Sequence, residues 1–392
     1  MSLRVGIAGY GIVGKTRHKV LAQHEAFDVI AVSDINFKEN PIELDNIHTY
    51  CEYEDLINAE DLDVLFVSLP NKLASEATLS GLKKGLHVFC EKPPARSLEE
   101  LYPIRDFLKE NTDLKLMYGF NHRFHASIID AISIIRDGSL GKVVNLRGVY
   151  GKSNMISFNQ TDWRTKRSES GGGILLDQGI HMLDLMRYFA GDFTSVHSFI
   201  SNSFWNFDVE DNAYVMMKSD TGIVAQLMSS ATQWQHTFNL NITLEKGSLV
   251  LGGLRTSSKS YGEETLRIIS SDAEKLNTKP QVEERSYDED ISWDEEIKCF
   301  AGVLLNSDNI ENGSIDEALK IMESFLSYRG KNYTYNISKP GISEQTCTRL
   351  SPHLTWGTIS SKEILQLLNS KRKALLEDDI KNWKKNLSSV IS

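Results

Sequence analysis

The sequence predicts an α/β protein with a doubly wound parallel sheet at the N-terminus and, after it, an α/β domain with an open antiparallel sheet. Residues 1–120 alternate between short apolar runs and amphipathic stretches, which is typical of parallel strands joined by helices. From about residue 140, apolar and polar residues alternate with a period of two, which indicates antiparallel strands. Residues 330–392 carry ten Lys or Arg and five Asp or Glu, and this change in composition marks a short helical extension. We therefore expect domains at 1–120, 121–329 and 330–392.

The first predicted strand leads into three glycines with the spacing G-x-G-x-x-G. Gly9 permits a tight turn, Gly11 lets the backbone approach a pyrophosphate, and Gly14 lets the next helix pack closely on the sheet. Asp34 ends the second apolar run 20 residues after Gly14, where a carboxylate can accept a hydrogen bond from a ribose hydroxyl. A glycine-rich turn without a ligand is the alternative. The strand before the glycines and the acid after them favour a dinucleotide, and the acid favours NAD(H) over NADP(H).

The rest of the first domain follows from apolar runs and one helix signal. Continuous apolar runs at 64–69 and 87–90 predict further buried strands of the parallel sheet. Ser97 and Glu100 have the spacing of a capping box, which predicts that a helix begins there. Pro103 lies inside this helix, and we expect a kink because proline lacks the N–H donor.

The second domain is predicted from strands, turns and one helical insert. Apolar positions alternate in 144–150 and 213–217, and glycine-containing turns at 220–222 and 245–247 join neighbouring strands. The segment 171–189 has apolar residues at helical spacing. It can therefore pack back against the first domain.

One face of such a sheet is expected to stay uncovered within the chain. Tyr214 and Met216 alternate with the apolar positions that face the core, and an apolar outer face usually finds a partner. We expect a homodimer or homotetramer built through the second domain.

Charge and cysteine content exclude several classes of protein. The net charge of −10 argues against a general nucleic-acid or anionic-membrane surface. The four cysteines have no C-x-x-C spacing, so neither a disulfide framework nor a zinc site is indicated. The first strand begins within about four residues of Met1, and no apolar run approaches the ~18 residues of a membrane span. We expect a cytoplasmic protein with reduced thiols and no bound metal.

Lys92 is the first candidate for chemistry. The strand that ends at Cys90 delivers Glu91, Lys92 and Pro93 to the carboxyl edge of the parallel sheet, where doubly wound folds bind ligands. A lysine held near a cationic nicotinamide ring loses its proton more easily, which suits proton transfer. The alternative is a solvated loop lysine.

Asp177 and His181 are the second candidates. They lie four residues apart after a run of three glycines, so on a helix they share one face. A carboxylate beside an imidazole can orient the ring and make it an acid or base near neutrality. The alternatives are a pair that only crosses a helix interface and half of a metal site, for which the sequence places no third ligand.

Together with these residues, a set of ordered motifs resembles the Gfo/Idh/MocA oxidoreductase family. The resemblance covers about residues 3–325 and implies an N-terminal Rossmann domain and a C-terminal α/β domain with an open antiparallel sheet. It also implies reversible hydride transfer between NAD(H) and a sugar, nucleotide sugar or cyclitol. The motifs are GIAGYGIVG (6–14), VSLPN (67–71), GLHVFCEKPPA (85–95), GFNHRFH (119–125), DWR (162–164) and GGGILLDQGIH (171–181).

Positions that match the family motifs suggest functional residues. The resemblance implies Lys92, Asp177 and His181 as the catalytic group. The implied substrate-binding residues are Lys92, Arg123, Trp163, Arg164, Asp177 and His181. The implied cofactor-binding residues are Gly9, Tyr10, Gly11, Ile12, Val13, Gly14, Asp34, Ser68, Pro70, Asn71, Glu91 and Lys92.

The C-terminal extension has a different resemblance. The stretches RGKNYTYNIS (329–338) and CTRLSPHLTWGTIS (347–360) are similar to the beginning of the FAD-binding domain of the photolyase/cryptochrome family. That resemblance would give Thr348 and Ser351 a contact with flavin phosphates. The segment lacks the parts that enclose the rest of a flavin, so we expect a truncated fragment that binds no FAD and is dispensable for the dehydrogenase.

Two other functions are consistent with parts of the sequence. A non-catalytic NAD-binding protein would lack Lys92 or His181, but both are present. A flavoprotein or DNA-binding module acting through residues 330–392 would need a complete helical domain. An NAD(H)-dependent dehydrogenase acting on the CH–OH group of a small sugar-type substrate is the function the sequence favours.

Overall fold

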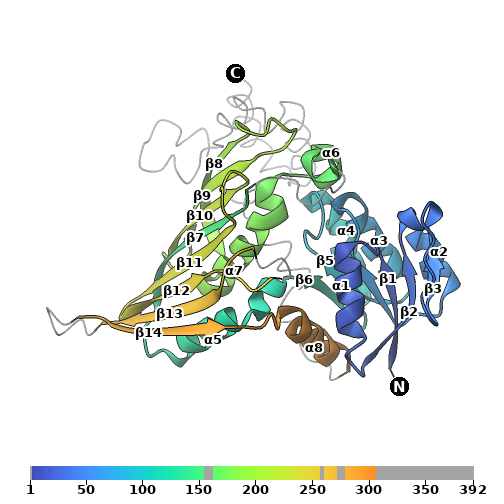
Figure 1. Ribbon diagram of the computed structural model, residues 1–392, viewed down its shortest axis with the longest axis horizontal. Helices are drawn as coiled ribbons and strands as arrows, with labels where there is room; N and C mark the ends of the chain where they lie inside the picture. Colours follow the sequence, from blue (N-terminus) through green and yellow to red (C-terminus); the bar gives the residue numbers. More distant parts are fainter. Residues whose placement is uncertain (1, 154–161, 257–259, 272–278, 306–392) are drawn as a thin grey trace, which may run out of the picture. The chain divides into compact units, whose positions relative to one another are not determined.

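The computed structural model describes residues 2–153, 162–256, 260–271 and 279–305, all of which belong to one unit of the chain, Met1–Met322. Their strands form two sheets (Figure 1). Among the described helices, none combines the length and the apolar character needed to cross a bilayer.

Six strands form an all-parallel N-terminal sheet in the order β3-β2-β1-β4-β5-β6 (Figure 1). The chain order reverses between β1 and β4, which is the switch point where doubly wound sheets bind ligands. This is the predicted fold class of the N-terminal domain. The elements are β1 (Leu3–Ala8), α1 (Ile12–Leu21), β2 (Phe27–Ser33), η1 (Ile35–Lys38), β3 (His48–Tyr50), α2 (Tyr53–Ala59), β4 (Val64–Val67), α3 (Asn71–Lys83), β5 (His87–Glu91), η2 (Leu98–Glu100), α4 (Tyr102–Glu110) and β6 (Leu116–Gly119).

Both faces of this sheet are covered, as its continuous apolar strands predict. In β4, Leu65 and Val67 belong to a core cluster that includes side chains of α2, α3 and α4. Val64 and Phe66 belong to a second cluster. That second cluster includes side chains of α1 and of α8 (Ser292–Leu305), the last described helix, which therefore completes the core of the N-terminal sheet.

Arg17 links α1, β5 and α8 from inside the core. Its Nε donates to Glu91 Oε1 at 2.6 Å and its Nη2 donates to Glu296 Oε2 at 2.6 Å. The Arg17 and Glu296 side chains are buried, and the guanidinium lies 4.3 Å from the ring centre of Trp293. Two carboxylates share one guanidinium. Burial, and then the neighbouring charge of Glu91, raises the pKa of Glu296 to about 7, although Arg17 opposes this shift.

This raised pKa predicts a pH dependence of stability. The folded protein binds the Glu296 proton more tightly than the unfolded chain, whose ordinary pKa is 4.5. The free energy of unfolding should therefore fall as the pH rises from about 5 to about 7, by on the order of 3 kcal/mol from this group. Glu296→Gln should remove that fall in urea titrations, whereas exposed Glu284→Gln should not. An unchanged slope in Glu296→Gln would contradict the assignment.

The second sheet has eight strands in the order β14-β13-β12-β11-β7-β10-β9-β8. Helices α5 and α7 cover one face, where their apolar side chains join those of the strands in one core cluster. Residues 220–222 and 245–247 form the predicted turns of two antiparallel pairs. The elements are η3 (Asn121–Phe124), α5 (Ala126–Asp137), β7 (Val143–Gly151), η4 (Asp162–Thr165), α6 (Arg167–Ser170), η5 (Leu175–Gly179), α7 (Ile180–Ala190), β8 (Phe193–Ser201), β9 (Asn212–Ser219), β10 (Val224–Ser230), β11 (Thr237–Leu244), β12 (Gly247–Gly252), β13 (Glu264–Ser270) and β14 (Gln281–Tyr287).

The expectation of a purely antiparallel sheet is wrong at one place. Strands β7 and β10 pair in parallel, with Leu146 opposite Ala225 and Tyr150 opposite Ser229. The sheet is therefore mixed. Period-two alternation reports that one face of a strand is buried and carries no information on the direction of its neighbour.

The prediction of a kinked helix that begins near Ser97 and contains Pro103 is also wrong. Ser97 precedes only the short turn η2 and makes no side-chain capping bond, and Pro103 lies in the first turn of a separate helix, α4. Proline is well tolerated there because the first N–H groups of a helix have no intrahelical partner.

The helical insert of the second domain is confirmed with one irregularity. Residues 175–179 form a π-turn before α7 begins at Ile180. Ile180 belongs to the core of the N-terminal sheet, and Leu176 and Leu183 pack against it. The insert thus packs back against the first domain, as predicted.

Candidate active site

The glycine loop between β1 and α1 has the geometry of a phosphate cradle. Gly9 has φ +91°, and a Cβ at Gly14 would lie 2.0 Å from the Gly9 carbonyl oxygen. A Cβ at Gly11 would meet no atom within 4 Å among the described residues. Gly11 precedes α1 and, as the N-cap, makes no side-chain capping bond to the first N–H groups of the helix. These features fit a dinucleotide pyrophosphate.

Asp34 lies beside this loop, immediately after β2. Its Oδ2 accepts from the Tyr10 N–H at 3.0 Å, and its Oδ1 accepts from the Asn36 N–H at 2.9 Å. The carboxylate is therefore held at the edge of the sheet next to the glycines, which fits a ribose contact.

The other predicted cofactor positions differ in their surroundings. Ile12 is 64% exposed and Ser68 has a buried hydroxyl with no hydrogen-bond partner among the described residues. Val13 lies in the first turn of α1 and Pro70 precedes α3. Two further positions have protein partners: Asn71 Nδ2 donates to the Ser170 carbonyl at 2.8 Å and Glu91 accepts from Arg17.

Lys92 follows β5 and reaches across to the helical insert. Its Nζ donates to the main-chain oxygen of Asp177 at 2.7 Å. Burial, with the charges of Arg164 and Lys152, lowers the pKa of Lys92, while Asp177 opposes this. A lysine in these surroundings exchanges a proton nearer neutrality than an exposed one does. The solvated-loop alternative does not describe this side chain.

The Asp177 carboxylate has other partners than the sequence predicted. Its Oδ2 accepts from Lys152 Nζ at 2.9 Å, and its Oδ1 lies 3.4 Å from Arg164 Nε. Burial alone would raise the pKa of Asp177, but the charges of Lys152, Lys92 and Arg164 lower it. The expectation that Asp177 orients the His181 ring is not met among the described residues, because Lys152 and Arg164 engage the Asp177 carboxylate and His181 Nδ1 has no hydrogen-bond partner.

His181 packs against another imidazole. The rings of His181 and His122 stack with centroids 3.7 Å apart at 18°. Burial, and then His122, Lys92 and His125, lowers the pKa of His181 well below its ordinary value. His181 Nδ1 is buried without a hydrogen-bond partner among the described residues. His181 is therefore a neutral ring at physiological pH.

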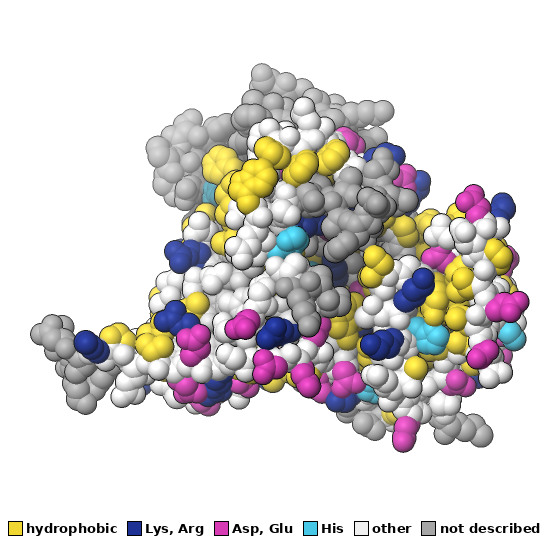
Figure 2. Space-filling model, viewed as in Figure 1, with side chains coloured by type: hydrophobic (Ala, Val, Ile, Leu, Met, Phe, Trp, Pro, Cys, Tyr) yellow, Lys and Arg dark blue, Asp and Glu magenta, His cyan; other side chains and the backbone are white. Residues whose placement is uncertain are grey.

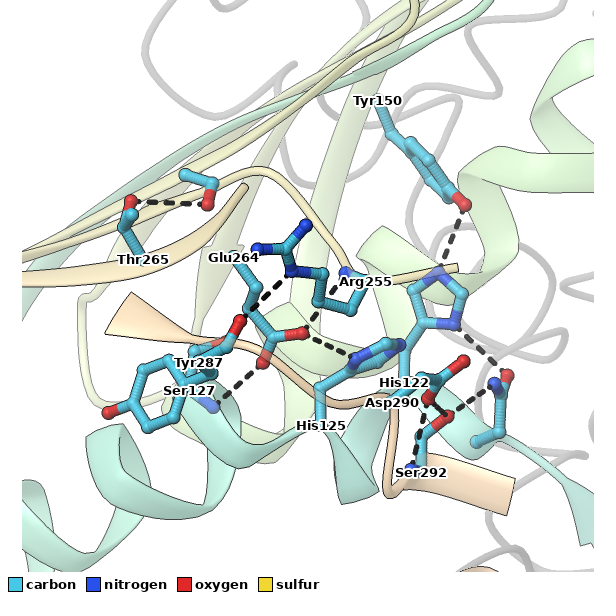
Figure 3. Close-up of polar contacts among 12 residues, drawn as sticks. His122, His125, Ser127, Tyr150, Arg255, Glu264, Thr265, Tyr287, Asp290 and Ser292 are labelled. Atoms are coloured by element: carbon cyan, nitrogen blue, oxygen red, sulfur yellow. Dashed lines mark hydrogen bonds and ion pairs between the residues drawn. The ribbon is translucent and has the colours of Figure 1, made fainter. Parts of the chain in front are cut away.

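Figure 3 shows what holds His122 in place. Its Nε2 is 3.0 Å from the Tyr150 hydroxyl and its Nδ1 is 3.1 Å from Asn121 Oδ1. Beside it, His125 Nδ1 is 2.9 Å from the buried Glu264 carboxylate. Both of these contacts of His122 come from neutral groups.

Of the remaining predicted substrate residues, two lie at the site and one does not. The Arg164 guanidinium lies 4.3 Å from the Trp163 ring centre and beside Asp177, so these two residues join the site. Arg123 does not. It is 4% exposed and donates through Nε and Nη2 to the buried Asp184 carboxylate at 2.7 and 2.6 Å. Its place in the core gives it a structural role.

Sequence reasoning missed Lys152, His122 and Tyr150. His122 lies within the motif GFNHRFH, Tyr150 ends a predicted strand and Lys152 follows it by two residues, but no pattern indicated that these segments meet. Among the described residues, no group of three or more His, Cys, Asp or Glu side chains is arranged to hold a metal ion.

Two family models match the described sheets. "Oxidoreductase family, NAD-binding Rossmann fold" matches residues 3–120, and "GFO/IDH/MocA C-terminal domain" matches residues 128–250. Neither model extends to residues 330–392, which lie outside the described residues. The resemblance of that segment to photolyases is not supported.

Related proteins point the same way. Levoglucosan dehydrogenase of Pseudarthrobacter phenanthrenivorans is 26% identical over 290 residues, which cover 64% of this chain and 73% of that protein. Inositol 2-dehydrogenase of Salmonella typhimurium is 24% identical over 256 residues, 63% of this chain and 73% of that protein. Across the relatives compared, the matched part spans from 55% to 73% of their length. The structure of levoglucosan dehydrogenase in complex with NADH shares the fold, with a TM-score of 0.70 at 20% identity, covering 82% of this chain and 94% of that chain.

Proposed function

The chain belongs to the Gfo/Idh/MocA family of NAD-binding oxidoreductases, and from this premise we propose that it transfers a hydride between NAD(H) and a carbinol or carbonyl carbon of a sugar, nucleotide sugar or cyclitol. The names of its relatives, which include a levoglucosan dehydrogenase and an inositol 2-dehydrogenase, support this substrate class. The observation that carries the proposal is the position of the Lys92 amine. Its Nζ donates to the Asp177 carbonyl, and burial lowers its pKa.

The residues of the site suit proton transfer at a hydroxyl group. NAD⁺, when bound, supplies the hydride acceptor. In oxidation, neutral Lys92 accepts the hydroxyl proton, and in reduction protonated Lys92 returns it. The neutral ring of His181 can hydrogen-bond the same oxygen without adding a charge. Trp163 and Arg164 supply a ring face and a planar cation for the sugar.

The direct test follows absorbance of the reduced nicotinamide while the protein is incubated with NAD⁺ and a panel of sugars, nucleotide sugars and cyclitols. We expect turnover of at least one compound and its loss in His181→Asn purified in the same way, which excludes a contaminating dehydrogenase. NAD⁺ binding without turnover of any compound in either direction would favour a non-catalytic NAD-binding protein.

Asp34 is expected to select NAD(H) over NADP(H). Its carboxylate, fixed by the Tyr10 and Asn36 N–H groups, would repel a 2′-phosphate and accept from a 2′-hydroxyl. We expect NADP⁺ to bind at least about tenfold more weakly than NAD⁺, a difference of about 1.4 kcal/mol in binding free energy. Asp34→Ser should reduce the ratio of the NADP⁺ and NAD⁺ dissociation constants. Glu39→Gln, at an exposed position just beyond, should leave it unchanged. Equal binding of both cofactors by the wild-type protein would contradict this.

We also propose a homodimer or homotetramer built through the face of the second sheet that no described helix covers. Phe199 is 80% exposed and lies opposite Tyr214, and Met216 follows on the same face. Figure 2 shows hydrophobic side chains gathered near the ends of β8 and β9. Tyr214→Glu should shift the mass measured by light scattering toward the monomer, whereas Ile129→Glu on α5 should not. A monomeric wild-type protein at micromolar concentration would refute the proposal.

Other partners are expected to be few. Acidic and basic side chains are interspersed along the lower part of the face in Figure 2. A surface of mixed charge does not favour binding of a polyanion. We propose a cytoplasmic enzyme whose partner is its small substrate. We further propose domains at 1–120, 121–329 and 330–392, the last binding no FAD.

A further inference from the structure

Lys152 is brought to the site by the parallel pair of strands. It directly follows β7, and its N–H donates to the Ser230 carbonyl at the end of β10 at 2.8 Å. Its carbonyl accepts from the Gln233 N–H at 3.0 Å. Because β7 and β10 run in the same direction, their carboxyl ends finish together. The backbone of Lys152 is therefore fixed on both sides.

Asp177 uses different atoms for its two lysine partners. Its main-chain oxygen accepts from Lys92 Nζ at 2.7 Å, and its carboxylate accepts from Lys152 Nζ at 2.9 Å. The Lys152 side chain is 7% exposed, so its ammonium group has little contact with water. The carboxylate, which would otherwise be the strongest neighbouring partner of Lys92, is thus engaged by Lys152.

We propose that Lys152 is a positioning residue for the reaction: by engaging the Asp177 carboxylate and adding a positive charge beside Lys92, it keeps the Lys92 amine able to accept a proton. The catalytic consequence of Lys152 rests on the proposed function. The protonation of the Lys92 amine, by contrast, is a property of the protein without substrate. It assigns Lys152 no contact with the substrate.

The charges around Lys92 support this assignment. Arg164 and Lys152 are positive and disfavour the protonated amine, whereas Asp177 and Glu91 are negative and favour it. His122 and His181 also lie close enough to feel the charge of Lys92, and both are neutral rings. Burial makes the largest contribution to the lowered pKa of Lys92, and loss of Lys152 would remove one of the two positive charges that oppose protonation of the amine.

Titration of Lys92 in the protein without substrate tests the proposal. Acetic anhydride labelling at a series of pH values, read by peptide mass spectrometry against exposed Lys83, gives the midpoint at which Lys92 becomes reactive. We expect the midpoint to lie at clearly higher pH in Lys152→Met than in the wild-type protein, and Lys152→Arg to restore it because the charge is kept. A residue that only stabilised the fold would not move this midpoint. An unchanged midpoint in Lys152→Met would overturn the proposal.

A pH profile of kcat/KM for oxidation provides the second readout. In Lys152→Met the acidic limb should move to higher pH, with a loss of about tenfold on the acidic side and a largely retained alkaline plateau, since one neighbouring charge changes. If Lys152→Met does not fold by circular dichroism, Lys152→Gln carries the same test. A moved labelling midpoint in a protein that oxidises no sugar would uphold the role of Lys152 and refute the proposed function. Turnover of sugars by the wild-type protein, with an unchanged labelling midpoint in Lys152→Met, would uphold the proposed function and refute the role of Lys152.

Discussion

Replacing Lys92 by methionine is expected to lower kcat by about 10²- to 10⁴-fold, the usual range for loss of a general acid–base group. Methionine keeps much of the length and apolar stem of lysine but removes the amine that donates to the Asp177 carbonyl. The measurement is steady-state oxidation of the best sugar in the panel at saturating NAD⁺.

Lys83→Met is the matched control for this variant. Lys83 is the exposed last residue of α3, so its loss should leave kcat within about twofold of wild type. Circular dichroism and NAD⁺ binding show whether the fold is retained. A folded Lys92→Met protein that turned over at the wild-type rate would remove Lys92 from the mechanism.

The second large effect is expected at Arg17. Arg17→Met should lower the free energy of unfolding by about 3–5 kcal/mol, because removing one partner of a buried ion pair leaves uncompensated charge in the core. Here the charges left behind are Glu91, whose side chain is 14% exposed, and Glu296, whose side chain is 0% exposed. The measurement is urea unfolding at pH about 8.

Lys298→Met on the same helix as Glu296 is the control. Lys298 makes ion pairs with Asp294 and Glu295 on the surface of α8, and surface pairs contribute about 0–1 kcal/mol. If Arg17→Met were no more destabilising than Lys298→Met, the guanidinium would not be what holds α1, β5 and α8 together.

The fold of the N-terminal half could be predicted because its signals are local. Gly9, Gly11 and Gly14 each meet a steric demand of one turn, and Asp34 lies at the end of the next strand. The apolar run at 64–69 predicted a strand buried on both faces, and side chains of β4 belong to both core clusters. Where a segment's own residues determine its conformation, one sequence is sufficient.

The errors concern features that depend on distant segments. The direction of β10 relative to β7 depends on the path of the chain between them, which alternation within a strand does not encode. The spacing of Asp177 and His181 predicted a contact between them, but Lys152, which follows β7, engages the Asp177 carboxylate. Arg123 shares a motif with site residues, yet its bond to Asp184 places it in the core.

The sequence by itself determined the glycine loop and the parallel sheet and indicated the candidate residues Lys92, Asp177 and His181, because each is part of a short motif with its own steric or chemical requirement. Only the tertiary structure decided their partners. Lys152 reaches Asp177 through a parallel strand pair, and His122 of η3 stacks on His181 of α7. Burial and neighbouring charge set the protonation of Lys92 and His181, and both are properties of the space around a residue, which exists only after distant segments have packed together.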